Sequence, residues 1–154
     1  MDVKKQPRTF EEEGILKTLN EAIQIIFTEL KSIDPEVLQK TTGLLFASNL
    51  DYKTYKDKKK KDKLIYDARR AASYILLDQL IFYDRLSSEL PDKYPPLSPT
   101  TGTTLQPLKE KFDRVLQDNY SAIFISNIIP YLPKSEATIT AINQVIGILS
   151  SVDL

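Results

Sequence analysis

The sequence predicts an all-α protein, a bundle of about five to six helices around a buried central helix at about residues 62–88. Apolar residues recur at helical spacing over most of the chain. Strand patterns are almost absent, and the one candidate, Ala122–Ile125, fits a helix equally well. With 154 residues and 42% hydrophobic residues, the chain is long enough for one domain with a sizeable core. We expect a tail over residues 1–8 and a single helical domain over residues 9–154.

Two helices are predicted before the middle of the chain. The first begins near Thr9, because Thr9-x-x-Glu12 has the form of a capping box. Its apolar residues keep helical spacing as far as Leu30. Asp34-Pro35 then supplies an N-cap and a proline at the first helical position, which predicts a second helix over residues 35–46.

A basic segment over residues 51–63 separates these helices from the central one. Lysines outnumber acidic residues strongly in this segment. Such a run is typical of a solvated loop or of the exposed start of a helix.

The central helix contains the apolar run Asp67–Leu86. Its apolar residues point to all sides, so we expect at least about three neighbouring helices to pack on it. Asp78 and Gln79 are the only polar residues between Tyr74 and Tyr83. We therefore expect Asp78 to be buried or half-buried, with Arg85 as a partner, because a buried carboxylate without a partner is costly. We interpret Asp78, Gln79 and Arg85 as structural anchors and not as catalytic residues.

The last third of the chain alternates loops and helices. Residues 91–107 contain five prolines and one glycine, which predicts a long connection with little regular structure. Leu105 to about Asp118 reads as a helix, and a short apolar segment runs from Ala122 to Ile129. A final helix is predicted from about Ser135.

Composition excludes several kinds of chemistry. The absence of cysteine removes thiolate catalysis and cysteine-ligated metals, and the absence of histidine removes the usual general base. An oxygen-only metal site remains possible. Basic and acidic residues balance at 21 each, so net charge indicates no partner. No signal peptide or membrane span is apparent, and we expect a cytoplasmic protein without a membrane partner.

One stretch resembles a known family. The run Arg70–Tyr83 is similar to a helix of the N-terminal helical domain of N6-adenine DNA methyltransferases. These are the modification subunits of type I restriction systems and related fused restriction-modification enzymes. The family helix reads approximately Arg-x-Ala-Ala-Tyr-Leu-Leu-Leu-Asn-Gln-Leu-Leu-Phe-Tyr, so Gln79 matches and Asp78 replaces Asn. The run Phe112–Phe124 and the continuation Tyr131-Leu132-Pro133 are also similar, so the resemblance covers roughly residues 62–154.

The catalytic parts of that family are not found in this chain. The family binds S-adenosylmethionine at a Gly-rich turn, whereas the four glycines here are far apart. Its catalytic motif is Asn-Pro-Pro followed by an aromatic residue, and no asparagine here precedes a proline. The resemblance therefore implies a non-catalytic domain without catalytic, cofactor-binding or metal residues. S-adenosylmethionine is expected only for a catalytic domain that this chain does not contain.

The resemblance also implies partners. In the family, this domain packs on the methyltransferase core, helps to enclose DNA and contacts the specificity subunit or domain. Under this interpretation the basic segment is a candidate phosphate contact, because lysines near DNA release counterions. Tyrosines interleaved with the lysines could stack on bases or donate hydrogen bonds. The candidates are Lys53, Lys56, Lys58, Lys59, Lys60, Lys61, Lys63, Tyr52 and Tyr55.

Two alternatives remain open at this point. A free-standing helical module for protein–protein interaction would have the same composition and no affinity for DNA. A metal-dependent nuclease is suggested by Asp34 followed by Asp51-Tyr52-Lys53, the order of a carboxylate and an Asp-x-Lys motif. That chemistry normally needs adjacent strands, which this region does not predict.

Overall fold

The computed structural model describes residues 10–41, 56–102, 104–118, 120, 124 and 128–151. Every regular element in these ranges is a helix, so the predicted all-α class is confirmed. The elements in chain order are α1 (Phe10–Glu29), the 3-10 turn η1 (Leu30–Ser32), α2 (Pro35–Thr41), α3 (Lys58–Glu89), α4 (Gln106–Leu116), the 3-10 turn η3 (Ile129–Tyr131) and α6 (Glu136–Ser151).

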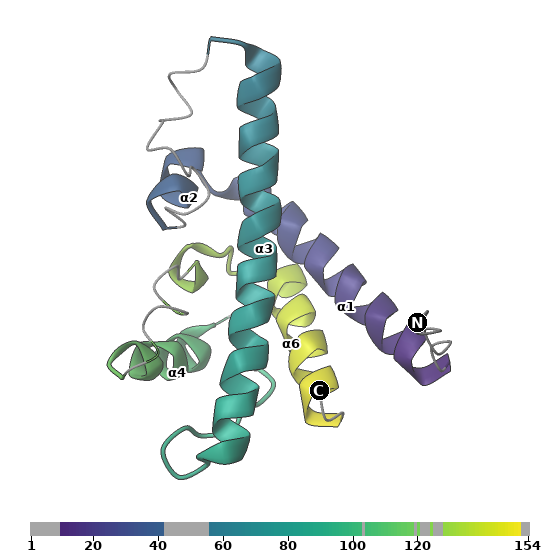
Figure 1. Ribbon diagram of the computed structural model, residues 1–154, viewed down its shortest axis with the longest axis vertical. Helices are drawn as coiled ribbons and strands as arrows, with labels where there is room; N and C mark the ends of the chain where they lie inside the picture. The colour runs from purple at the N-terminus through teal and green to yellow at the C-terminus, as the bar shows by residue number, and fades with distance from the viewer. Residues whose placement is uncertain are drawn as a thin grey trace, which may run out of the picture.

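Helix α3 runs through the whole molecule, and the other elements lie around its middle and its C-terminal half (Figure 1). Helices α1 and α6 lie antiparallel to each other on one side of α3 and contact both each other and α3. Helices α2 and α4 lie on the opposite side. The first turns of α3 extend beyond all of these elements.

The start of α2 is as predicted. The Asp34 carboxylate accepts a hydrogen bond from the Glu36 backbone N–H at 2.8 Å, and Pro35 occupies the first helical position. The end predicted for this helix, near residue 46, lies outside the described residues, as does Thr9 of the expected capping box.

The start of the central helix was predicted wrongly. Helix α3 begins at Lys58, four residues before the expected start near Asp62. Asp57 is its N-cap, and the Asp57 side chain accepts a hydrogen bond from the Lys59 backbone N–H at 2.9 Å. Of the two interpretations of the basic segment, residues 58–63 therefore follow the second, the exposed start of a helix.

The core lies where α3 meets α1, α4 and α6. Leu76, Leu80 and Tyr83 of α3 are fully buried, and Ala72 permits close approach. The buried aromatic ring of Phe112 on α4 contacts Phe124 edge-on, with 4.8 Å between ring centroids, and Tyr83 at 6.2 Å. Phe124, the one described residue of the candidate strand Ala122–Ile125, has helical backbone and is fully buried in this core.

The expectation that α3 is buried on all sides is wrong. Tyr74 is 41% exposed, and the Asp78 and Arg85 side chains are also exposed. These residues share one face at spacings of four and seven residues, the spacing of a helical stripe. The core therefore covers one broad side of α3, and solvent covers the other.

The described residues from Pro91 to Leu105 form no regular helix or strand, as predicted, but the predicted end of the connection at Pro107 is wrong because α4 begins at Gln106. Polar side chains hold the connection against the body. Tyr83 Oη donates to the Pro95 carbonyl at 2.7 Å, and Ser87 Oγ donates to the Tyr94 carbonyl at 2.8 Å. The Asn143 side chain on α6 accepts from the Thr100 N–H at 2.7 Å and donates to the Thr100 carbonyl at 2.9 Å. The connection is therefore an ordered strap between α3 and α4.

Among the described residues, no helix combines the length and the apolar character that crossing a membrane requires.

The aromatic contact between α3 and α4 should account for a large part of the stability. Phe112→Ala removes a fully buried ring and leaves a cavity, so we expect a loss of about 3–5 kcal/mol in unfolding free energy. Urea unfolding measures this loss. Tyr131→Ala is the matched control, since Tyr131 is 51% exposed, and its effect should stay below about 0.5 kcal/mol. Equal effects of the two substitutions would contradict the assigned core.

Two tyrosines, Tyr83 of α3 and Tyr94 of the strap, make stability depend on alkaline pH. Burial raises the pKa of Tyr83 to about 12. The hydrogen bond that Tyr94 Oη donates to Asp118, at 2.5 Å, raises the pKa of Tyr94 to about 12. Both shifts favour the protonated folded form, so their stabilisation is complete below the ordinary pKa of 10.0 and is lost as pH rises toward 12.

We therefore expect the stability difference between the wild type and a Tyr83→Phe/Tyr94→Phe variant to shrink between about pH 10 and 12. Urea unfolding of both proteins across this range measures it. The double variant cancels the contribution of lysine deprotonation, which both proteins share. A difference that is constant with pH contradicts the two assignments.

Candidate nucleic-acid interface

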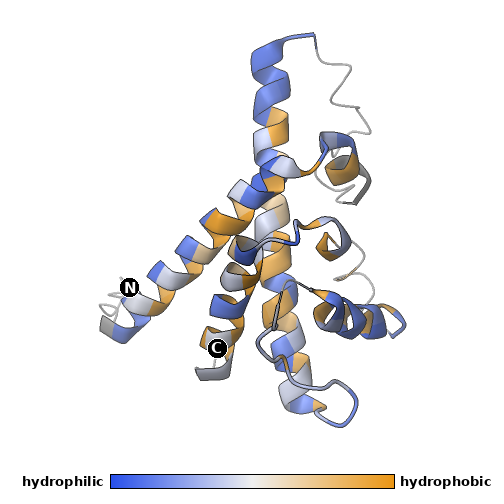
Figure 2. Ribbon diagram, turned by 180° about the vertical axis from the view of Figure 1, so that it is seen from behind, coloured by the Kyte–Doolittle hydropathy of each residue, from blue (hydrophilic) through white to orange (hydrophobic). Residues whose placement is uncertain are grey.

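The N-terminal turns of α3 form a basic surface. Lys56, Lys58, Lys59, Lys60 and Lys63 are exposed, and Lys61 is half-buried. Figure 2 shows the first turns of α3 as hydrophilic, projecting beyond the other helices, which carry both hydrophilic and hydrophobic residues. Helix formation places these lysines around one rigid rod, whereas a loop would have left their spacing undefined.

The electrostatics of this end favour an anion. No acidic residue occupies the first turn of α3, and Lys58, Lys59, Lys60 and Lys61 follow one another there. The helix macrodipole places partial positive charge at the same end. Lysines at this position oppose the dipole and do not help the helix to form, whereas the Asp57 cap does. The charges of the lysines and the helix dipole therefore add to a positive potential at a solvent-exposed helix end.

Part of the predicted site lies outside the described residues. Lys53, Tyr52 and Tyr55 belong to this group, and so does Asp51 of the nuclease alternative. Asp34, the other carboxylate of that alternative, is engaged as the cap of α2. The described residues contain no group of three or more acidic side chains placed to hold a metal ion.

The sequence interpretation missed residues that continue the basic surface along α3. Tyr66 is 50% exposed, Tyr74 is 41% exposed, and Arg70 between them is also exposed. Lys59, Lys63, Tyr66, Arg70 and Tyr74 follow one another at steps of three or four residues, which places them on one helical face. The spacing was visible in the sequence, but the expectation of a fully buried helix hid it.

Of the three predicted anchors, Gln79 is buried, whereas Asp78 and Arg85 are exposed. Gln79 is 1% exposed and lies inside the core. Asp78 is exposed, so its predicted burial is wrong, and Arg85 forms an ion pair with Glu89 at 3.6 Å instead of reaching it. The reason is rotational: Asp78 lies on the same solvent-facing stripe as Tyr74.

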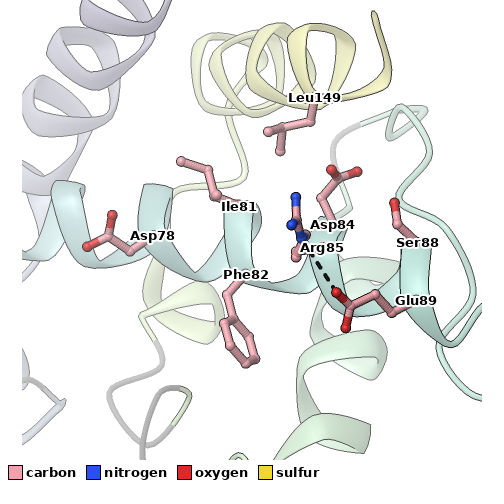
Figure 3. A pocket seen from close by; sticks show the side chains of 8 residues that line it. All are labelled: Asp78, Ile81, Phe82, Asp84, Arg85, Ser88, Glu89 and Leu149. Atoms are coloured by element: carbon pink, nitrogen blue, oxygen red, sulfur yellow. Dashed lines mark ion pairs between the residues drawn. The ribbon is translucent and has the colours of Figure 1, made fainter. Parts of the chain in front are cut away.

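Asp78 and Arg85 border a groove of about 650 Å³ between α3 and the end of α6. Figure 3 shows Ile81 and Leu149 approaching each other across it, with Asp78 at one end and Glu89 at the other. Carboxylates outnumber the one cation, Arg85, along its rim. This end of α3 is therefore acidic, opposite in sign to the beginning of the helix.

Comparisons with protein-family models, with curated proteins and with solved structures found no match to this chain.

Two neighbouring substitutions test the revised anchors. Asp78→Asn should change the unfolding free energy by less than about 0.5 kcal/mol, because the side chain is exposed. Gln79→Ala should cost more than about 1 kcal/mol, because it empties a buried position. Thermal unfolding of both variants measures the contrast. A larger effect of Asp78→Asn would restore the buried-anchor interpretation.

Proposed function

We propose that this chain is a non-catalytic helical domain of an N6-adenine DNA methyltransferase of a restriction-modification system, where it positions DNA or the specificity module beside the catalytic domain. The observation that carries the proposal is the projecting basic end of α3. Its exposed lysines offer a polyanion a rigid, positively charged rod. Catalysis and S-adenosylmethionine binding belong to a separate catalytic domain.

The family-like residues support this role as a scaffold. Phe82 of the first run contacts Tyr120 and Phe124 of the second, and Tyr83 contacts Phe112, with ring centroids 5.6 to 6.2 Å apart. The two similar stretches therefore pack on each other and build one core. A shared core is what a common helical domain would require, since its side chains must fit together.

The lysines would act through phosphates. Each Lys⁺ that approaches a phosphate displaces condensed counterions, which gives an affinity that depends on salt and not on base sequence. Such a contact fixes the position of the duplex and leaves sequence reading to the specificity module. The rigidity of α3 would transmit that position to the body of the domain.

A helical interaction module without a nucleic-acid role is the second candidate. The exposed side of α1 favours it, where Leu16 is 37% exposed beside half-buried Ile25 in a shallow depression. The same surface is also available for docking on a catalytic domain. DNA affinity separates the two candidates.

The test is a salt titration of DNA binding. For a fluorescent duplex, the logarithm of the binding constant should fall linearly with the logarithm of salt concentration. Replacing Lys58, Lys59, Lys60 and Lys61 by Gln should reduce the magnitude of the slope by up to about 3.6, since about 0.9 is lost for each of the four phosphate contacts. Fluorescence anisotropy measures both slopes.

The matched control replaces Lys17, Lys109, Lys111 and Lys134 by Gln, an equal change in net charge away from the beginning of α3. Its slope should stay near that of the wild type. Equal losses in the two variants would indicate a general charge effect. If the protein has no affinity for DNA at any salt concentration, the nucleic-acid role is contradicted and the interaction module is favoured.

A further inference from the structure

The exposed face of α3 continues from the basic end to two exposed tyrosines, Tyr66 and Tyr74. Over residues 56–74 the chain carries eight basic residues against three acidic ones, Asp57, Asp62 and Asp67. Tyr66 and Tyr74 are the large side chains exposed on this stretch, and Arg70 lies midway between them. Both tyrosines leave a large part of their side chains in water, since 50% of Tyr66 and 41% of Tyr74 remain exposed. Their position points to a ligand with planar rings and negative charge.

Contacts within the domain hold one of these rings in place. Tyr66 meets Phe27 of α1 edge-on, with 5.1 Å between ring centroids, and half of its surface remains open. Lys31 lies over the other aromatic partner, with Nζ 5.7 Å from the Phe27 ring centroid. Lys31, on η1, therefore places a positive charge over the Phe27 ring that Tyr66 contacts, and adds a cation from outside α3.

A small hollow accompanies the two tyrosines. It has a volume of about 150 Å³ and lies between α1 and α3, lined by Ile23, Gln24, Phe27, Tyr66, Arg70, Ser73 and Tyr74. Sites for drug-sized ligands measure about 300–1,000 Å³. The hollow is thus too small for an extended ligand and suits a single planar group that projects from a chain running along the surface.

We propose that this face binds an unpaired DNA strand, with bases stacked on Tyr66 and Tyr74 and the backbone phosphates held by Lys59, Lys63, Lys31 and Arg70. Single-stranded nucleic acid is bound in this way, by a basic track with aromatic platforms. The two tyrosines are about 12 Å apart along the helix axis. They therefore act as separate platforms for non-adjacent bases, and Arg70 faces the backbone between them.

The inference rests on the proposed nucleic-acid role and adds a mode of binding that duplex contact does not need. Duplex DNA keeps its bases stacked inside and offers the tyrosines only phosphates and sugars. An unpaired strand offers ring faces. Stacking needs the aromatic ring and not its hydroxyl, whereas a hydrogen bond to phosphate needs the hydroxyl.

The experiment compares ring removal with hydroxyl removal. Binding of a fluorescent oligothymidylate of about 12 nucleotides, a length within the usual range for one site, is measured by anisotropy. We expect Tyr66→Ala/Tyr74→Ala to weaken binding by about tenfold or more. Tyr66→Phe/Tyr74→Phe should retain binding to within about twofold, because the rings remain. Tyr131→Ala is the control, since Tyr131 is equally exposed but lies on η3, and it should bind as the wild type does.

Each other outcome has a definite meaning. If the Phe pair loses as much as the Ala pair, the hydroxyls bind phosphate and stacking is overturned. If the Ala pair binds normally while the Lys58–Lys61 variant does not, the stacking face is overturned and the proposed function stands. If the wild type binds neither the single strand nor a duplex, both proposals fail. Thermal unfolding of every variant shows whether weaker DNA binding results from a destabilised fold after loss of the contact with Phe27. Tyr66→Phe/Tyr74→Phe keeps that contact, so its affinity for the oligonucleotide distinguishes stacking from hydrogen bonding even if the Ala pair is destabilised.

Discussion

Helix α3 is longer than the body that packs on it, and the rest of the structure follows from this mismatch. Its 32 residues span about 48 Å. Its buried residues begin only at Ala68, so the first ten residues, Lys58–Asp67, contain none that is fully buried. Apolar packing in this segment starts only with Leu64 and Ile65 against Ala68 and with Tyr66 against Phe27. The turns before Leu64 are largely in water, which lysine side chains tolerate. The same excess length makes the basic end project from the domain.

The covered part of α3 is fastened by two different kinds of interaction. Apolar burial joins it to α1, α4 and α6 around Leu76, Leu80 and Tyr83. Directional hydrogen bonds join it to the strap, where Tyr83 and Ser87 donate to backbone carbonyls. Tyr83 belongs to both sets, because its ring lies in the core and its hydroxyl reaches Pro95. The strap therefore keeps its position without regular secondary structure.

Charge is distributed unevenly along the same helix. Its first half is basic, and its second half carries Asp78, Asp84 and Glu89 against Arg85. Such a separation attracts a polyanion to the beginning of the helix and repels it from the end. The net charge of zero gives no indication of this uneven distribution.

The sequence alone determined the helical class, the cap of α2, the irregular proline-rich connection and the starts of α4 and α6, because local spacing, caps and prolines act over a few residues. It also located the lysines. It did not determine which side of α3 faces solvent. Apolar residues such as Tyr74 and Ile81 lie on both sides of Asp78 along the helix, so their pattern does not select a buried side. The positions of α1 and α6 select it. Tertiary structure therefore exposed Asp78 and joined Tyr66, Arg70 and Tyr74 to the lysines. The physical reason is that burial depends on neighbours distant in sequence, whereas helix formation depends on neighbours a few residues away.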